Sequence, residues 1–200
     1  KAKQGFGVDK VILLGDTLEL HVFFDAEIVS GEHTKMVNYL LNSPDIILLR
    51  GNHDSELTQY KHSLVIDNVY FQHGDLADIS SLRFIQVLST WWNIKVLRFL
   101  YRKNPEKLRK YLLKIVGTYS NGYRANANTL YYLKYALRWL NKYDMVVMGH
   151  THQMQNVNLF YNGKKKIYLN TGTSLDHLEC FIIDTQTLDY KIIRPDQRKN

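Results

Sequence analysis

The sequence predicts an α/β protein whose strands end in polar side chains along one edge of a sheet. Short apolar runs of strand length recur along the chain, and several end in Gly, Asp, Asn or His. A stretch with helical spacing separates the first two runs, an order that favours neighbouring parallel strands. A long basic segment of helical character interrupts the later runs. We therefore expect a single α/β domain over residues 1–200 that contains an α-helical insertion.

The first half of the chain supplies two polar strand ends. The run Val11–Leu14 stops at Gly15-Asp16, and the run Ile46–Leu49 is closely followed by Gly51-Asn52-His53-Asp54. Apolar residues at helical spacing predict a helix over 34–41 between the two runs. We expect the two strands to be parallel, so that both polar ends lie at the same edge of the sheet.

The second half supplies two more strand ends and a closing hairpin. Runs over 64–66 and 69–72, separated by Asp67-Asn68, predict a hairpin that ends at His73. Beyond the helical segment, the run Met145–Met148 ends in Gly149-His150-Thr151-His152. A further run over 167–169 precedes Asn170-Thr171-Gly172-Thr173, and the runs 178–183 and 188–193 predict the closing hairpin.

Composition and charge limit the class of protein. Two hundred residues with 45% apolar content suit one domain with a proper core. The single cysteine, Cys180, excludes an intramolecular disulfide framework and fits a reducing compartment; we expect it to be a buried strand residue. The net charge is +7, but segment 76–143 holds 13 Lys and Arg against two acidic residues, whereas the rest holds 13 against 17. The basic character therefore belongs to that one segment.

The four polar strand ends together favour a metal site. A lone histidine at a strand end usually makes local hydrogen bonds, the role we assign to His21, His33, His62 and His177. Clustered Asp, Asn and His at a sheet edge instead share an explanation in metal binding. Such ligands without cysteine suit Mn, Fe, Zn, Co or Ni rather than structural zinc. A carboxylate such as Asp16 can bridge two cations about 3.5–4 Å apart, which hold a hydroxide and clamp phosphate oxygens.

The same motifs, in this order, resemble motifs two to five of the calcineurin-like metallophosphoesterases. The resemblance covers most of the chain outside the basic segment. It implies a sandwich of two mixed β-sheets flanked by helices. It also implies hydrolysis of a phosphoester or pyrophosphate bond by a metal-bridging hydroxide, with two divalent transition-metal ions, Mn²⁺ first among them.

The resemblance also implies a role for each strand-end residue. The implied metal ligands are Asp16, which bridges both ions, Asn52, His73 and His150, which bind one ion, and His152, which binds the other. His53 would steady the transition state or protonate the leaving oxygen. Asp54 would support the ligands from behind, as metal sites commonly require.

One family motif is missing from the sequence. The family carries Asp-x-His on an opening strand, but Asp9 is followed here by Lys10 and Val11. We expect a truncated or incompletely ordered N-terminus rather than a true absence, because Val11–Leu14 would otherwise begin the sheet without an opening strand. The rival hypothesis is a non-catalytic scaffold that kept the fold and lost its metals. The intact later motifs argue against it.

Segment 76–143 is predicted to form an α-helical cap beside the site. Helices are expected over 82–101, 106–116 and Asn128–Leu140, the last with its leucines on one face. Arg124 and Asn126, between the second and third helices, are candidate substrate contacts. The cations could track a nucleic-acid backbone, or the cap could receive an acylated phosphate substrate and rest on anionic headgroups. The heavy aliphatic content favours the lipid partner.

The basic insert between His73 and His150, with Gly-Asp-x-x-Glu starting at Gly15, resembles the UDP-2,3-diacylglucosamine hydrolase group. Those enzymes cleave the pyrophosphate of a lipid A precursor at the inner face of the bacterial membrane. The resemblance implies a cytoplasmic protein with peripheral contact to that membrane. The group usually carries Arg where this chain has His53, so a general phosphatase, phosphodiesterase or nuclease of the superfamily stays an alternative.

Overall fold

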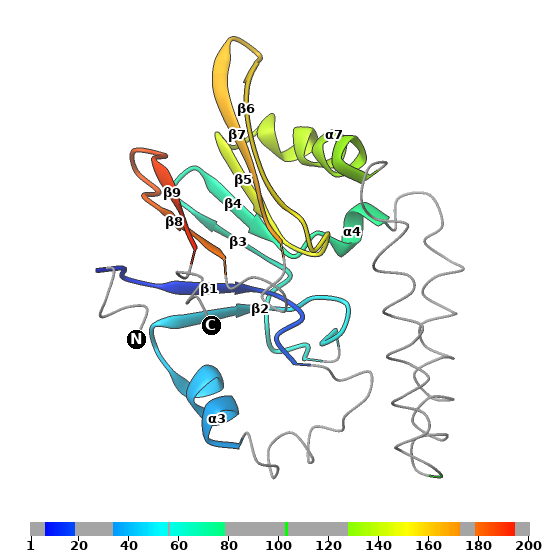
Figure 1. Ribbon diagram of the computed structural model, residues 1–200, viewed down its shortest axis with the longest axis vertical. Helices are drawn as coiled ribbons and strands as arrows, with labels where there is room; N and C mark the ends of the chain where they lie inside the picture. The colour runs from blue at the N-terminus through cyan, green and yellow to red at the C-terminus, as the bar shows by residue number, and fades with distance from the viewer. Residues whose placement is uncertain are drawn as a thin grey trace, which may run out of the picture.

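The computed structural model describes residues 7–18, 34–55, 57–78, 103, 128–172 and 179–194, which form a mixed α/β fold (Figure 1). Its helices are α3 (Thr34–Asn42), α4 (Asp75–Asp78) and α7 (Asn128–Leu140). Its strands are β1 (Val11–Leu14), β2 (Ile46–Leu49), β3 (Ser63–Ile66), β4 (Val69–Gln72), β5 (Met145–Met148), β6 (Met154–Tyr161), β7 (Lys164–Thr171), β8 (Cys180–Ile183) and β9 (Tyr190–Ile193). The α/β prediction is confirmed.

A five-stranded mixed sheet of order β3-β4-β5-β7-β6 forms the centre of the molecule. Its central strand β5 is apolar throughout because it is buried on both faces. Val146 and Met148 face a cluster that includes Tyr132, Ala136 and Leu140 of α7. Met145 and Val147 face the opposite cluster, which contacts β1, β2, β8 and β9. The sheet therefore lies between helix α7 and a second layer of strands (Figure 1).

The second layer consists of a parallel pair, β1-β2, and the antiparallel hairpin β8-β9. In the pair, Leu14 is opposite Leu49, so both strands end at the same level, as the strand–helix–strand order predicted. Helix α3 connects the two strands and lies against β2 on the outer side (Figure 1). The sequence predicted two mixed sheets; the described strands divide into one mixed sheet and these two smaller units.

A groove lies beside β1, the first strand in the described part of the chain. Among the described residues β1 pairs only with β2, and β8 pairs only with β9. A groove of about 600 Å³ separates β1 from β8, with Ile12 and Leu14 on one side and Phe181 and Ile183 on the other. Cys180 lies in a strand as predicted, at the start of β8, but it is exposed, so the expected buried position is wrong.

Segment 76–143, the predicted cap, is described mainly at its two ends. Helix α7 has the predicted bounds, while Arg124, Asn126 and the expected helices over 82–101 and 106–116 lie outside the described residues, apart from Lys103. The predicted leucine face is wrong at Leu130, which is 75% exposed, because Tyr132, Ala136 and Leu140 make the fully buried face. None of the helices in the described part of the chain combines the length and hydropathy needed to cross a membrane.

Candidate metal centre

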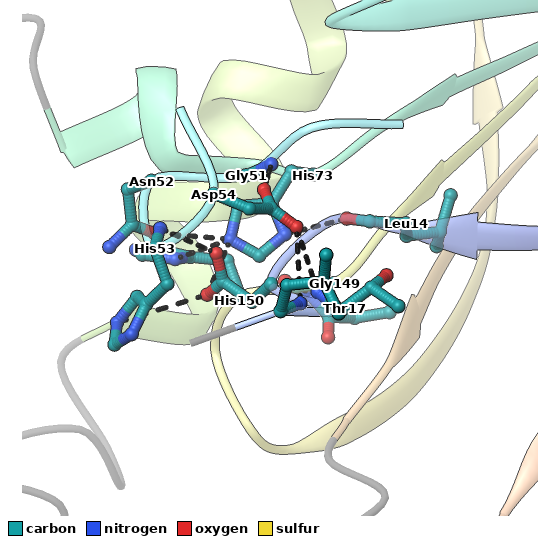
Figure 2. Close-up of polar contacts among 12 residues, drawn as sticks. Leu14, Thr17, Gly51, Asn52, His53, Asp54, His73, Gly149 and His150 are labelled. Atoms are coloured by element: carbon teal, nitrogen blue, oxygen red, sulfur yellow. Dashed lines mark hydrogen bonds and ion pairs between the residues drawn. The ribbon is translucent and has the colours of Figure 1, made fainter. Parts of the chain in front are cut away.

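Four strand ends meet at one place in the fold. Asp16 follows β1. Asn52 follows β2, His73 follows β4 and His150 follows β5 (Figure 2). Parallel pairing of β1 with β2, and of β4 with β5, brings the ends of each pair to a common edge. The ligand atoms of Asp16, His73 and His150 all lie within 4.8 Å of one another. The structure thus brings together side chains that are up to 134 positions apart in the sequence.

His73 is the centre of this group. Its ring is only 4% exposed, and its Nδ1 lies 2.6 Å from the carbonyl oxygen of Leu14. Because a carbonyl only accepts, Nδ1 carries the hydrogen, and the other ring nitrogen, Nε2, keeps a lone pair in the neutral ring. That arrangement orients a histidine for metal binding through Nε2.

Three further donor atoms surround Nε2 of His73. Oδ2 of Asp16 and Nδ1 of His150 each lie 3.1 Å away, and Oδ1 of Asn52 lies 3.2 Å away. Ligand atoms about 2.1 Å from a shared ion and at right angles to one another would be about 3.0 Å apart. The observed spacings therefore fit one divalent cation, and the mixture of carboxylate, amide oxygen and imidazole suits a transition metal. We name these four residues the inner cluster.

The charges of the inner cluster complement each other. Burial raises the pKa of the Asp16 carboxyl, but the hydrogen bond and charge of His73, together with His53, outweigh burial and hold that pKa well below its ordinary value. Burial lowers the pKa of the His73 ring, and the hydrogen bond and charge of Asp16 outweigh it, so that pKa is raised. The site therefore favours an anionic carboxylate beside a positive charge. A metal ion can supply this charge in place of the His73 proton.

Two glycines allow the loops to approach closely enough for this geometry. Gly15 has φ of 94°, and a Cβ there would lie 2.6 Å from the backbone nitrogen of Gly51 and 2.8 Å from the His73 ring. A Cβ at Gly51 would overlap Oδ1 of Asp16. The sequence indicated a turn or a close approach at Gly51, and close approach is what the structure uses.

Asp54 connects the loop after β2 to the loop after β1. The side chain is 2% exposed. Its Oδ1 accepts the N–H of Gly51 at 2.5 Å, and its Oδ2 accepts the N–H groups of Thr17 at 2.9 Å and Leu18 at 3.5 Å. Both oxygens are directed at backbone donors, so Asp54 holds the two loops in register rather than presenting a carboxylate to a substrate.

His53 lies at the solvent side of the inner cluster. Its backbone N–H donates to Oδ1 of Asp16 at 2.9 Å, which orders the loop, and its ring nitrogen Nε2 is 4.0 Å from Oδ2 of Asp16. The side chain is 34% exposed, against 4% for His73. A half-exposed imidazole beside a metal site can reach a bound phosphate and exchange protons with water.

His152 occupies a different position from the inner cluster. It is exposed and has φ of 58°, and within the described residues it does not belong to the group formed by Asp16, His73 and His150. We name His53 and His152 the outer histidines.

Comparison with known proteins now identifies the family. The family model for calcineurin-like phosphoesterases matches residues 1–154. The chain belongs to this family. It is therefore a phosphoester hydrolase of the metallophosphoesterase type, a family that typically binds divalent metals, and Asp16, His73 and His150 of the inner cluster form a possible ligand group for such an ion.

Comparisons with solved structures and curated sequences tell less about this chain than the family model does. An archaeal phosphodiesterase is similar with 16% identity and a TM-score of 0.44, covering 97% of this chain and 87% of its own. A predicted phosphoesterase from Streptococcus pneumoniae is similar with 16% identity and a TM-score of 0.38, covering 98% of this chain and 73% of its own. No curated protein matches this phosphoesterase.

Sequence reasoning missed several residues that build the centre. The Leu14 carbonyl, which orients His73, leaves no signal because any residue offers the same carbonyl group. Asn170 is completely buried behind the His150 loop. Its signal was visible, since Asn170 directly follows an apolar run as the metal-site residues do, but no role was assigned to it.

Proposed function

We propose that this phosphoesterase hydrolyses its substrate with two divalent cations, one held by the inner cluster and one shared between Asp16 and His152. The observation that carries the proposal is the close arrangement of three donor atoms around Nε2 of His73, each 3.1 to 3.2 Å from it. Mn²⁺ is the first candidate because the carboxylate and amide oxygens of Asp16 and Asn52 suit it, and Fe, Zn, Co and Ni are the alternatives because imidazole ligands suit such metals.

Asp16, His53 and Asp54 each have a separate part in the proposed hydrolysis. Divalent cations at such a site supply an activated water nucleophile and neutralise charge on phosphoryl oxygens. Asp16 keeps its negative charge at neutral pH, because its pKa is held low, and so favours cations at the site. His53 stands at the rim of the site, where its protonated ring can donate to the leaving oxygen. Asp54 fixes the loop that carries both Asn52 and His53.

We further propose that the substrate carries an apolar group beside its phosphate, as a lipid-linked nucleotide such as UDP-2,3-diacylglucosamine does. Tyr132 of α7 packs with its ring centroid 6.1 Å from that of His150. Leu130, one half-turn earlier in the helix, exposes 75% of its surface. Leu130 therefore lies on the side of α7 opposite Tyr132, and this exposed leucine, together with the aliphatic content of segment 76–143, supports an acylated substrate over a purely polar one.

Partners and location follow from the same hypothesis. The basic segment 76–143 would place the enzyme on anionic headgroups at the cytoplasmic face of a membrane, where an acylated substrate resides. The single cysteine supports a reducing compartment. A nucleic-acid partner is less favoured because the segment is rich in aliphatic residues as well as basic ones.

The first experiment asks whether metal and activity go together. Full-length protein is stripped with a chelator, reloaded with Mn²⁺, and assayed on bis-p-nitrophenyl phosphate. We expect activity to be lost and restored with about two metal ions bound per chain. Full activity in the stripped protein, or a metal-loaded protein inactive on every phosphoester in a panel, would contradict the proposal.

The second experiment separates substrate classes with a matched pair of variants. Leu130→Ser removes the exposed leucine of α7, within the basic segment, and Phe160→Ser removes a side chain that is 77% exposed at the far end of β6. We expect Leu130→Ser to raise KM for UDP-diacylglucosamine but not for the non-acylated sugar nucleotide. Phe160→Ser should change neither. Equal effects of Leu130→Ser on both substrates would argue against an acyl-binding surface.

A further inference from the structure

The loop that carries two of the metal-site histidines has a strained backbone. The N–H of Thr151 donates to the carbonyl of Gly149 at 2.8 Å, a bond between residues two apart that defines a γ-turn centred on His150. His150 has φ of 69°, the sign found in the rarer and more strained form of this turn, and His152 has φ of 58°. Each such residue costs about 1–3 kcal/mol and persists only when its surroundings fix it.

Asn170 provides that fixation from the end of the neighbouring strand. Its side-chain Nδ2 donates to the carbonyl of Gly149 at 2.8 Å, and its Oδ1 accepts the hydroxyl of Thr151 at 2.9 Å. The side-chain amide therefore contacts both ends of the γ-turn and encloses His150 between its two contacts. Pairing of β5 with β7 places Asn170 opposite Met148, which puts the amide beside the start of the turn.

The remaining hydrogen-bonding positions of the Asn170 amide are also used. Nδ2 donates to the Tyr168 hydroxyl at 3.2 Å, and Oδ1 accepts the N–H of Gly172 at 3.1 Å. The Gly149 carbonyl can only accept and the Gly172 N–H can only donate, so these two contacts fix which end of the amide is which. The residue is 0% exposed. An aspartate in place of Asn170 would lack the two N–H donors of the amide. An apolar residue there would leave buried polar groups of the turn without partners.

We propose that Asn170 is a positioning residue for the metal centre: its amide holds the γ-turn in the conformation that presents His150 to the cation. Nδ1 of His150 lies 3.1 Å from Nε2 of His73 in this conformation. Relaxation of the turn would move that nitrogen away from the other donors of the inner cluster. Residues that orient metal ligands typically contribute about 10–100-fold to metal affinity. The metal part of this inference rests on the proposed function; the effect on the turn does not.

The decisive variant is Asn170→Ala, matched with Asn68→Ala. Asn68 also donates its side-chain amide, to the partly buried carboxylate of Asp144 just before β5, but it lies in the turn before β4, at the end of the sheet away from the site. We expect Asn170→Ala to weaken Mn²⁺ binding about 10–100-fold, as measured by calorimetric titration of the folded full chain. Asn68→Ala should lower thermal stability and leave Mn²⁺ affinity unchanged. Wild-type affinity in Asn170→Ala would overturn the proposal.

A double-mutant cycle distinguishes positioning from a separate structural effect. If Asn170 acts through His150, then His150→Ala combined with Asn170→Ala should bind Mn²⁺ no more weakly than His150→Ala alone. Fully additive losses would contradict the proposal. Thr151→Val keeps the Nδ2 contact of Asn170 to Gly149 but removes the Thr151 hydroxyl, which contacts both Asn170 and Gln153, and it should show a smaller loss in the same direction. It serves as the test variant if Asn170→Ala does not fold.

Hydrogen exchange provides a readout that needs no metal. We expect the Thr151 amide, which closes the γ-turn, to exchange faster in Asn170→Ala than in Asn68→Ala and the wild type. Unchanged exchange at Thr151 would overturn the proposal even if metal affinity fell. If the wild-type chain bound no Mn²⁺ at all, the function proposed above would fail, and this exchange measurement would still decide the role of Asn170.

Discussion

The inner cluster and the outer histidines differ in how the protein holds them. Within the inner cluster, His73 is 4% exposed and is oriented by a backbone carbonyl, and Asp16 accepts a backbone N–H. The outer histidines face solvent: His53 is 34% exposed and His152 is exposed. Preorganised ligands bind a metal ion without a cost for ordering them, whereas an exposed ring must first be ordered. Under the proposed function, this difference predicts one tight cation position at the inner cluster and a second, looser one at the surface.

The largest expected effect tests this asymmetry directly. His73→Ala removes the buried ring around which Asp16, Asn52 and His150 are arranged, and it should abolish tight Mn²⁺ binding and all turnover. His152→Ala should leave one tightly bound ion per chain and weaken only the second. Calorimetric titration of both variants gives the stoichiometry. If His152→Ala also eliminated the tight ion, the division into inner and outer positions would be wrong.

The next effect concerns turnover without a change in metal binding. His53→Ala removes a ring that stands 4.0 Å from the Asp16 carboxylate. We expect kcat to fall about 10²–10⁴-fold, the usual contribution of a positioned acid, with bound metal unchanged. Metal analysis and steady-state kinetics on the same preparation check both parts. Loss of metal in this variant would instead make His53 a ligand and move it into the inner cluster.

The inner cluster and the outer histidines also differ in how well their positions can be predicted from the sequence. Strand ends at Asp16, Asn52, His73 and His150 are local signals, because an apolar run followed by a polar residue is visible in any short window. The parallel order of β1 and β2 followed from the intervening helix, and it placed Asp16 beside Asn52 correctly. The assignment of His152 to a second ion stays a prediction, because the structure places it outside the cluster formed by Asp16, His73 and His150.

The features that could not be predicted from the sequence depend on how distant segments pair and pack against one another. Asn170 reaches Gly149 only because β7 pairs with β5 in one register. Similarly, no local pattern shows that Leu130 is exposed while Tyr132 is buried, since that depends on which side of α7 meets the sheet. Cys180 was misplaced for the same reason: strand position was predicted correctly, but burial is decided by what packs on the strand.

The variant Asp54→Asn tests whether the inner cluster depends on the contact between its loops. Asp54→Asn keeps one side-chain oxygen but places an amide N–H₂ among backbone donors, leaving at least one N–H of Gly51 or Thr17 without an acceptor. We expect a loss of about 1–3 kcal/mol in the free energy of unfolding and a fall of about tenfold in Mn²⁺ affinity.

Asp184 offers a matched control for this variant. Its carboxylate also accepts two backbone N–H groups, from Gln186 and Thr187, but it is exposed in the turn between β8 and β9. Asp184→Asn should cost less stability and leave metal affinity unchanged. Chemical denaturation and metal titration of both variants provide the comparison. A metal affinity unchanged in Asp54→Asn would show that the two loops keep their positions without the carboxylate.

The smallest expected change in the structure of the inner cluster is the one on removing the metal itself. The inner cluster is arranged by contacts within the protein, among them the Leu14 carbonyl on His73 and the Asp54 carboxylate on Thr17. Chelation should therefore lower stability only by the binding term, about 2.7 kcal/mol when free Mn²⁺ had been at 100 times its dissociation constant. Backbone amides at Thr17 and Gly51 should keep their protection from hydrogen exchange. Loss of protection at these amides on chelation would mean that the metal, rather than the fold, builds the inner cluster.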